Sequence, residues 1–188
     1  MSLTQSEVRK DAELIFKSVQ DDASHMPSAL QALKISSLFP LACLASYALS
    51  MVWIVISFSP PDDMWINPII HYLGGVLAFG AFTVILTLVL IATFYGPSLV
   101  YLAIPEKVRD SSAILLKIKR LSRNFGGVLT FVNFLYAVVC AFYPSAFYGA
   151  PFLLLMSYIV FQLVINAELV RYGIAPLMEK ISSLLKKI

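Results

Sequence analysis

The long apolar stretches of this sequence contain only four amide or acidic side chains: Asn133, Gln162, Asn166 and Glu168. Gln162 and Asn166 are four residues apart, so they share one face of a helix. Amides in an apolar environment hydrogen-bond between helices, which stabilises a bundle by about 0.6–2 kcal/mol per bond. The pattern leaves open whether these bonds form within the chain or whether the amides line a pore or a subunit interface.

Glu168 lies three residues before Arg171, a spacing that allows an ion pair on one face of a helix. An ionisable group in an apolar segment is often functional, because a charge is costly there. The sequence therefore allows three roles for Glu168: a helix-end ion pair, proton or ion handling, or contact with a partner.

The sequence lacks the common motifs of catalysis and cofactor binding. It contains no G-x-x-x-x-G-K-[ST], H-E-x-x-H, G-x-S-x-G or G-x-G-x-x-G pattern. Cys43 and Cys140 lie alone in apolar runs, which is typical of small buried side chains. His25 and His71 are expected on opposite sides of a membrane and cannot form one site. We therefore expect no enzymatic activity, no cofactor, no metal site and no nucleic-acid partner.

The overall composition indicates that these residues are held in a membrane. Hydrophobic residues make up 59% of the 188 residues, charged residues make up only 13%, and the mean hydropathy is +0.82. Soluble domains are about 45–50% apolar and about 25% charged. A soluble chain of this size has too little interior to bury so much apolar surface. The sequence therefore predicts an integral membrane protein.

Four apolar runs are long enough to cross a bilayer, which takes about 20 helical residues. We predict an all-α bundle of four transmembrane helices in a domain covering 35–169, with spans at about 35–58, 69–95, 125–142 and 151–169. Prolines after the first and third runs end those spans, because proline cannot continue the helical hydrogen bonds. Gly96-Pro97 marks either the end of the second span or a kink in a longer helix.

The basic residues predict the orientation of the chain. All 14 Lys and Arg fall in three segments: 1–34, 105–124 and 170–188. The two loops at 59–67 and 143–150 contain none. Cytoplasmic loops carry the excess of Lys and Arg, so both ends of the chain and the central loop are expected in the cytoplasm. The short loops and the absence of N-x-[ST] sequons favour a bacterial inner membrane.

Each cytoplasmic segment contains an amphipathic helical pattern, at 6–20, 111–123 and 176–188. In the last two, basic side chains oppose apolar ones, which suits the anionic inner leaflet of a bilayer or docking on a partner protein. The basic candidates for these contacts are Lys117, Lys119, Arg120, Arg123, Lys180, Lys186 and Lys187.

Small residues recur at helical spacing in the first two spans. Ala42, Ser46 and Ser50 repeat every four residues in the first, and Gly74 and Ala78 do so in the second. Such spacing lets helix backbones approach closely. It predicts packing faces, either inside the monomer or between copies of the chain.

These features favour a non-enzymatic inner-membrane protein of the immunity, exclusion or regulatory type, which acts by binding another membrane protein. The polar residues of the third and fourth spans suggest an alternative, a homo-oligomeric channel or small transporter. A structural subunit of a larger membrane complex is a further alternative.

Overall fold

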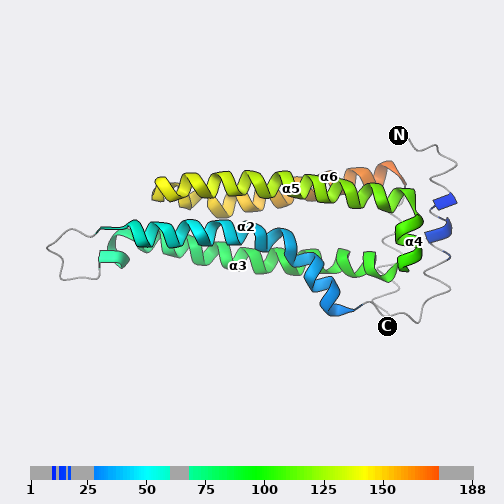
Figure 1. Cartoon of the computed structure of the whole chain (residues 1–188), viewed down its shortest axis with the longest axis horizontal. Helices are drawn as coiled ribbons and strands as arrows, with labels where there is room; N and C mark the ends of the chain where they lie inside the picture. The colour runs from blue at the N-terminus through cyan, green and yellow to red at the C-terminus, as the bar shows by residue number, and fades with distance from the viewer. Residues whose placement is uncertain (1–9, 12, 16, 18–27, 60–67, 174–188) are drawn as a thin grey trace. The chain divides into compact units, whose positions relative to one another are not determined.

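The computed structural model is helical throughout its regular secondary structure (Figure 1). It describes residues 10, 11, 13–15, 17, 28–59 and 68–173. In chain order, the helices are α2 (Ala29–Ser57), α3 (Pro68–Ala103), α4 (Glu106–Ser111), α5 (Ala113–Phe142), the 3₁₀ helix η1 (Pro144–Gly149) and α6 (Ala150–Arg171).

Four helical segments are long and apolar enough to cross a membrane. They cover Ala29–Ser57, Ile70–Ala103, Ala113–Phe142 and Pro144–Arg171, with mean hydropathies of 2.0, 2.5, 2.0 and 1.9. The prediction of a helical chain with four such helices is confirmed. The 36 residues of α3 extend about 54 Å, which is longer than the roughly 30 Å of a hydrocarbon core.

The observed helices are longer than the apolar runs of the sequence. α3 continues through Gly96 and Pro97, so of the two predicted alternatives the structure has the continuous helix. Proline is tolerated inside membrane helices because neighbouring groups satisfy the carbonyl that it frees. In α5, the amphipathic segment from Ala113 and the third apolar run form one helix of 30 residues.

A break at Ser112 separates α4 from α5. The backbone is extended there, with φ −73° and ψ 119°. The Ser112 hydroxyl oxygen accepts a hydrogen bond from the amide of Leu115 at 3.3 Å, an N-cap interaction. Asp11 Oδ2 adds to this cap, accepting hydrogen bonds from Ser112 Oγ at 3.0 Å and from the amide of Ile114 at 3.2 Å. A residue far away in the sequence therefore helps to cap the start of α5.

The chain divides into two compact units, which also divide its charges. The first comprises 1–37, 92–125 and 160–188, and the second comprises 38–91 and 126–159. Every Lys and Arg that the structure describes belongs to the first unit. The described residues of the second unit include no Lys, Arg, Asp or Glu.

The core of the first unit contains Ile15 from the N-terminal helical segment. Ile15 is fully buried and packs with Ile104 and Leu115. It lies one helical turn after Asp11, so one short segment supplies both an apolar contact and the carboxylate that caps α5.

The core of the second unit is aromatic and closely packed. The rings of Tyr47 and Phe147, both buried, meet edge to face with centroids 6.0 Å apart. Gly75 permits a close approach, because a Cβ at this position would lie 2.5 Å from Tyr148 Oη. Large apolar side chains such as Leu49 remain exposed on the outside of the unit.

Candidate functional site

Asn133 is the centre of a buried polar network in the second unit. Its Oδ1 accepts a hydrogen bond from Tyr47 Oη at 2.8 Å. Its Nδ2 donates to Ser157 Oγ at 2.8 Å and to the Leu129 carbonyl at 2.9 Å. Tyr47 lies on α2, Asn133 on α5 and Ser157 on α6. One fully buried carboxamide therefore connects three of the four candidate spans.

The apolar surroundings explain why these groups meet. A polar side chain buried without a partner costs free energy, so polar groups on neighbouring helices pair with one another. Both N–H groups of Asn133 are used in this way. Sequence reasoning singled out Asn133 but missed Tyr47 and Ser157. Tyr47 could have been found from its place in the middle of the first apolar run, because a buried phenol usually requires a hydrogen-bond partner.

The other two amides are not part of this network. Gln162 is half-buried and Asn166 is exposed, and both lie on α6 within the first unit. No hydrogen bond joins the Asn166 side chain to the residues that the structure describes. Its neighbours along the same face, Leu163 and Val170, are 63% and 68% exposed. The structure therefore presents Asn166 on an outward stripe and does not bring it to Asn133.

Glu168 forms the ion pair that its spacing predicts. Arg171 Nη1 lies 3.2 Å from Glu168 Oε1. The second carboxylate oxygen, Oε2, is buried and has no hydrogen-bond partner among the described residues. Tyr172, four residues further on, is 8% exposed, and its hydroxyl is also buried without a partner in that part of the chain. Two unsatisfied polar atoms therefore occur one helical turn apart.

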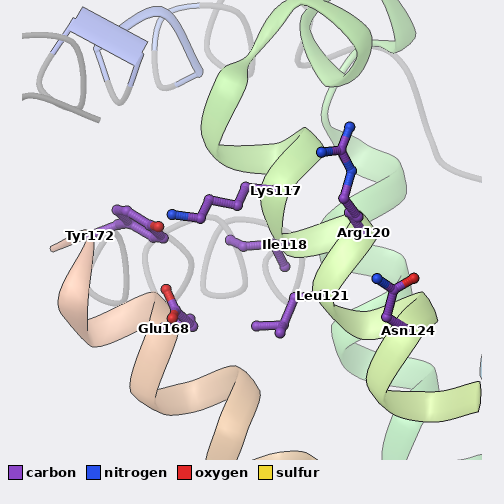
Figure 2. Close-up of a pocket in the computed structure, with 7 residues that line it drawn as sticks. All are labelled: Lys117, Ile118, Arg120, Leu121, Asn124, Glu168 and Tyr172. Atoms are coloured by element: carbon purple, nitrogen blue, oxygen red, sulfur yellow. The ribbon is translucent and has the colours of Figure 1, made fainter. Parts of the chain in front are cut away.

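A cavity of about 220 Å³ adjoins these two residues, between α5 and the end of α6 (Figure 2). Its lining residues are Lys117, Ile118, Arg120, Leu121, Asn124, Glu168 and Tyr172. Lys117 and Leu121 reach from α5 toward Glu168 and Tyr172, whereas the guanidinium of Arg120 points away from them. Lys117 Nζ lies 5.2 Å from the centroid of the Tyr172 ring, a cation–π contact.

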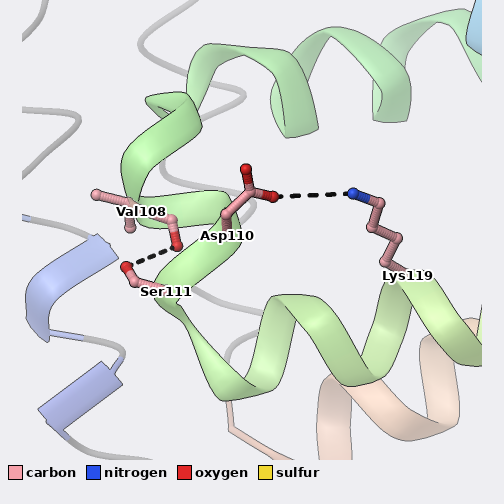
Figure 3. Close-up of polar contacts among 4 residues, drawn as sticks. All are labelled: Val108, Asp110, Ser111 and Lys119. Atoms are coloured by element: carbon pink, nitrogen blue, oxygen red, sulfur yellow. Dashed lines mark hydrogen bonds and ion pairs between the residues drawn. The ribbon is translucent and has the colours of Figure 1, made fainter.

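The other basic candidates in the described chain are on the surface. Lys119 Nζ lies 3.8 Å from Asp110 Oδ1, and both side chains are more than half exposed (Figure 3). In the same view, Ser111 Oγ donates to the Val108 carbonyl at 3.3 Å. Arg123 is exposed. An exposed ion pair adds little stability, so these side chains remain available for other contacts. Lys180, Lys186 and Lys187 lie outside the described residues.

Among the small residues of α2, Ser46 makes a hydrogen bond within its own helix. Ser46 Oγ donates to the Ala42 carbonyl at 3.1 Å, one turn earlier. Ser50 is buried, and its hydroxyl has no partner among the described residues. Of the three small residues on this face of α2, Ala42 and Ser46 are therefore partly buried and only Ser50 lies in the interior.

The small residues of α3 are in open surroundings. A Cβ at Gly74 would have nothing within 4 Å, and Ala78 is exposed. The close approaches occur instead at Gly75, against Tyr148, and at Gly80, against the Met51 methyl group. The stripe that the sequence predicts as a packing face is thus displaced from the contacts that α3 makes within the chain.

The cysteines and His71 show no arrangement for chemistry. Cys43 and Cys140 are buried free thiols, which confirms that they are small core side chains. His71 is exposed and meets Tyr72 edge to face, with centroids 5.1 Å apart. No group of three His, Cys, Asp or Glu side chains that could hold a metal ion occurs in the described ranges.

Comparison with protein-family models, with curated proteins and with solved structures finds no match. Three features of the geometry are candidates for function. They are the buried polar network around Asn133, the outward stripe around Asn166, and the cavity beside Glu168.

Proposed function

We propose that this chain is a non-enzymatic multi-pass protein of a bacterial inner membrane that acts by binding another membrane protein, as immunity, exclusion or regulatory proteins do. The exposed carboxamide of Asn166 on α6 carries this proposal. The proposed topology places both ends of the chain and residues 105–124, which cover α4 and the start of α5, in the cytoplasm, following the distribution of the basic residues.

The stripe around Asn166 has the composition of a helix–helix contact. Leu163, Asn166, Ala167 and Val170 follow the three- and four-residue spacing of one helix face, and all four are exposed. Asn166 comes near the end of the uncharged run 150–167, where an exposed amide gains more from a partner group on another helix than from contact with lipid. Asn133 finds its partners inside the chain, but Asn166 has none among the described residues. A second membrane protein would supply them.

The closed network favours partner binding over the alternative of a homo-oligomeric channel. A polar path along spans three and four would use Asn133, whose carboxamide is already bonded to Tyr47 and Ser157. Gln162 and Asn166 would then have to form the path in an oligomer. Ion flux in liposomes that falls in the variant Gln162→Leu with Asn166→Leu would favour the channel instead.

Partner binding is tested by purifying the tagged full chain from native membranes after mild cross-linking and identifying the proteins recovered with it. We expect one integral membrane protein, or a second copy of this chain, to be enriched over an untagged control. Asn166→Leu should lower its recovery by about threefold or more, because an interhelical hydrogen bond contributes about 0.6–2 kcal/mol.

Phe152→Leu is the matched control, because Phe152 lies on the same helix and is 63% exposed, as is Leu163. Its recovery should equal that of the unmodified chain. The proposal fails if no membrane protein is enriched, or if Asn166→Leu and Phe152→Leu both leave recovery unchanged.

A further inference from the structure

We propose that the cavity between α5 and α6 binds a phosphate ester that also carries an ammonium group, the chemistry of a phosphoethanolamine lipid headgroup. In this site, Lys117 and Tyr172 hold the phosphate, and Glu168 accepts hydrogen bonds from the ammonium. The inference goes beyond partner binding and does not depend on it.

The first support is the size and composition of the cavity. Its volume of about 220 Å³ exceeds the space of one water, about 30 Å³. It is smaller than the roughly 300–1,000 Å³ typical of sites for drug-sized ligands. The lining includes a cation, a carboxylate, a phenol and the apolar side chains of Ile118 and Leu121. A small zwitterion attached to an apolar body matches this combination.

The second support is the pair of unsatisfied atoms. The hydroxyl of Tyr172 can donate, and Glu168 Oε2 can only accept while the carboxylate is ionised. Both atoms are buried, and neither has a partner within the described residues. Buried polar atoms are nearly always hydrogen-bonded in folded proteins. The Glu168 and Tyr172 side chains line the cavity, so a ligand with an acceptor oxygen and an ammonium donor satisfies both atoms once the two side chains turn toward it.

The third support is the charge around the cavity. The structure gives Lys117 no carboxylate at ion-pair distance among the residues it describes, and its ammonium sits over the Tyr172 ring. Arg171 pairs with Glu168 through Oε1 only, which leaves Oε2 without a partner among the described residues. Because Arg120 points away from Tyr172 (Figure 2), Lys117 is the cation that reaches the phosphate.

The fourth support is the place of the cavity along the two helices. Residues 124–142 of α5 and 150–167 of α6 contain no charged side chain. At a rise of about 1.5 Å per residue, these runs are about 28 Å and 27 Å long, close to the hydrocarbon thickness of a bilayer. On α5, the charged lining residues Lys117 and Arg120 come seven and four residues before the first run, and on α6 Glu168 comes directly after the second. A membrane protein holds lipid headgroups at this level.

The test is retention of lipids by the purified full chain, measured by native mass spectrometry after exchange into micelles that contain phosphatidylethanolamine, phosphatidylglycerol or phosphatidylcholine. We expect phosphatidylethanolamine to be retained most strongly. Lys117→Gln and Tyr172→Phe should each weaken its retention about tenfold, since each removes a hydrogen bond to a charged group. Glu168→Gln should remove the preference for phosphatidylethanolamine over phosphatidylglycerol while leaving phosphatidylglycerol retention unchanged.

Lys119→Gln is the matched control, because Lys119 lies on the same helix but pairs with Asp110 outside the cavity. It should retain phosphatidylethanolamine as the unmodified chain does. Tyr172→Phe changes one atom and keeps the ring, so its effect is separable from misfolding, and circular dichroism of each variant checks the fold.

The proposal is overturned if all lipids are retained equally by every variant, or if none is retained and the cavity holds water only. Complete displacement of the lipid by soluble phosphoethanolamine at the same concentration would support the chemistry of the site but would overturn the assignment of its ligand to a lipid headgroup, because the ligand would then be a free metabolite. Each result leaves recovery of a protein partner through Asn166 unaffected, so the two proposals fail independently.

Discussion

Removal of the hydrogen bond between Tyr47 and Asn133 should destabilise the helical bundle by a measurable amount. Tyr47→Phe deletes the donor and leaves Asn133 Oδ1 buried without its 2.8 Å partner. We expect a loss of about 1 kcal/mol in the free energy of unfolding, the usual scale for interhelical hydrogen bonds in membranes. Asn133→Ala loses three hydrogen bonds and leaves a cavity, so it should cost about 2–4 kcal/mol.

The double variant isolates the contribution of the pair. If the two side chains interact directly, the cost of the double variant falls short of the sum of the single costs by about 0.6–1.7 kcal/mol. The measurement is equilibrium unfolding of the full chain in mixed micelles titrated with sodium dodecyl sulfate, followed by circular dichroism. Tryptophan fluorescence, to which Trp53 on α2 contributes, provides a second probe.

Ser46→Ala is the matched control for this cycle. Ser46 lies on the same helix as Tyr47, but its hydroxyl bonds to a carbonyl of its own helix. Its removal should change stability by about 0.5 kcal/mol or less. A coupling between Tyr47 and Asn133 below about 0.3 kcal/mol, within the usual error of additivity, would refute the view that the buried carboxamide holds the helices together.

Two further predictions concern packing and capping. Gly75→Leu should destabilise the bundle by up to about 1 kcal/mol, because the added side chain must displace the partly exposed Tyr148 side chain. Gly74→Leu should be tolerated because its Cβ meets open space, and unfolding titrations that rank the two variants in the opposite order would contradict this. Asp11→Ala should cost about 1 kcal/mol by removing a cap and should speed hydrogen exchange at the first turn of α5. Lys10→Ala, at an exposed neighbouring position, should leave that exchange rate unchanged, and equal rates in both variants would refute the capping role.

The number and positions of the candidate membrane helices could be read from the sequence. An uncharged apolar run long enough to cross a bilayer is a local property of the chain, because it depends only on consecutive residues. The positions of the helix ends were harder to predict from the sequence. α3 continues through Pro97 because neighbouring groups can satisfy the carbonyl that proline frees, and this depends on tertiary surroundings.

The pairing of polar residues was decided by the tertiary structure. Asn133, Gln162 and Asn166 are equivalent by residue type and setting, yet only Asn133 has Tyr47 and Ser157 on neighbouring helices within 2.8 Å. The rotation of each helix about its axis determines which amides face inward. In a chain that is apolar on all sides, the sequence pattern does not specify that rotation.

The rotation of each helix also decides which small residues and which charged side chains make contacts within the chain. The repeat at Gly74 and Ala78 is a valid packing pattern, but the rotation of α3 brings Gly75 against Tyr148 instead. The ion pair between Glu168 and Arg171 was predictable from the sequence, because the two residues are three apart on one helix. Only the tertiary structure placed Lys117 over the Tyr172 ring and created a cavity beside them, because that contact joins side chains far apart in the chain.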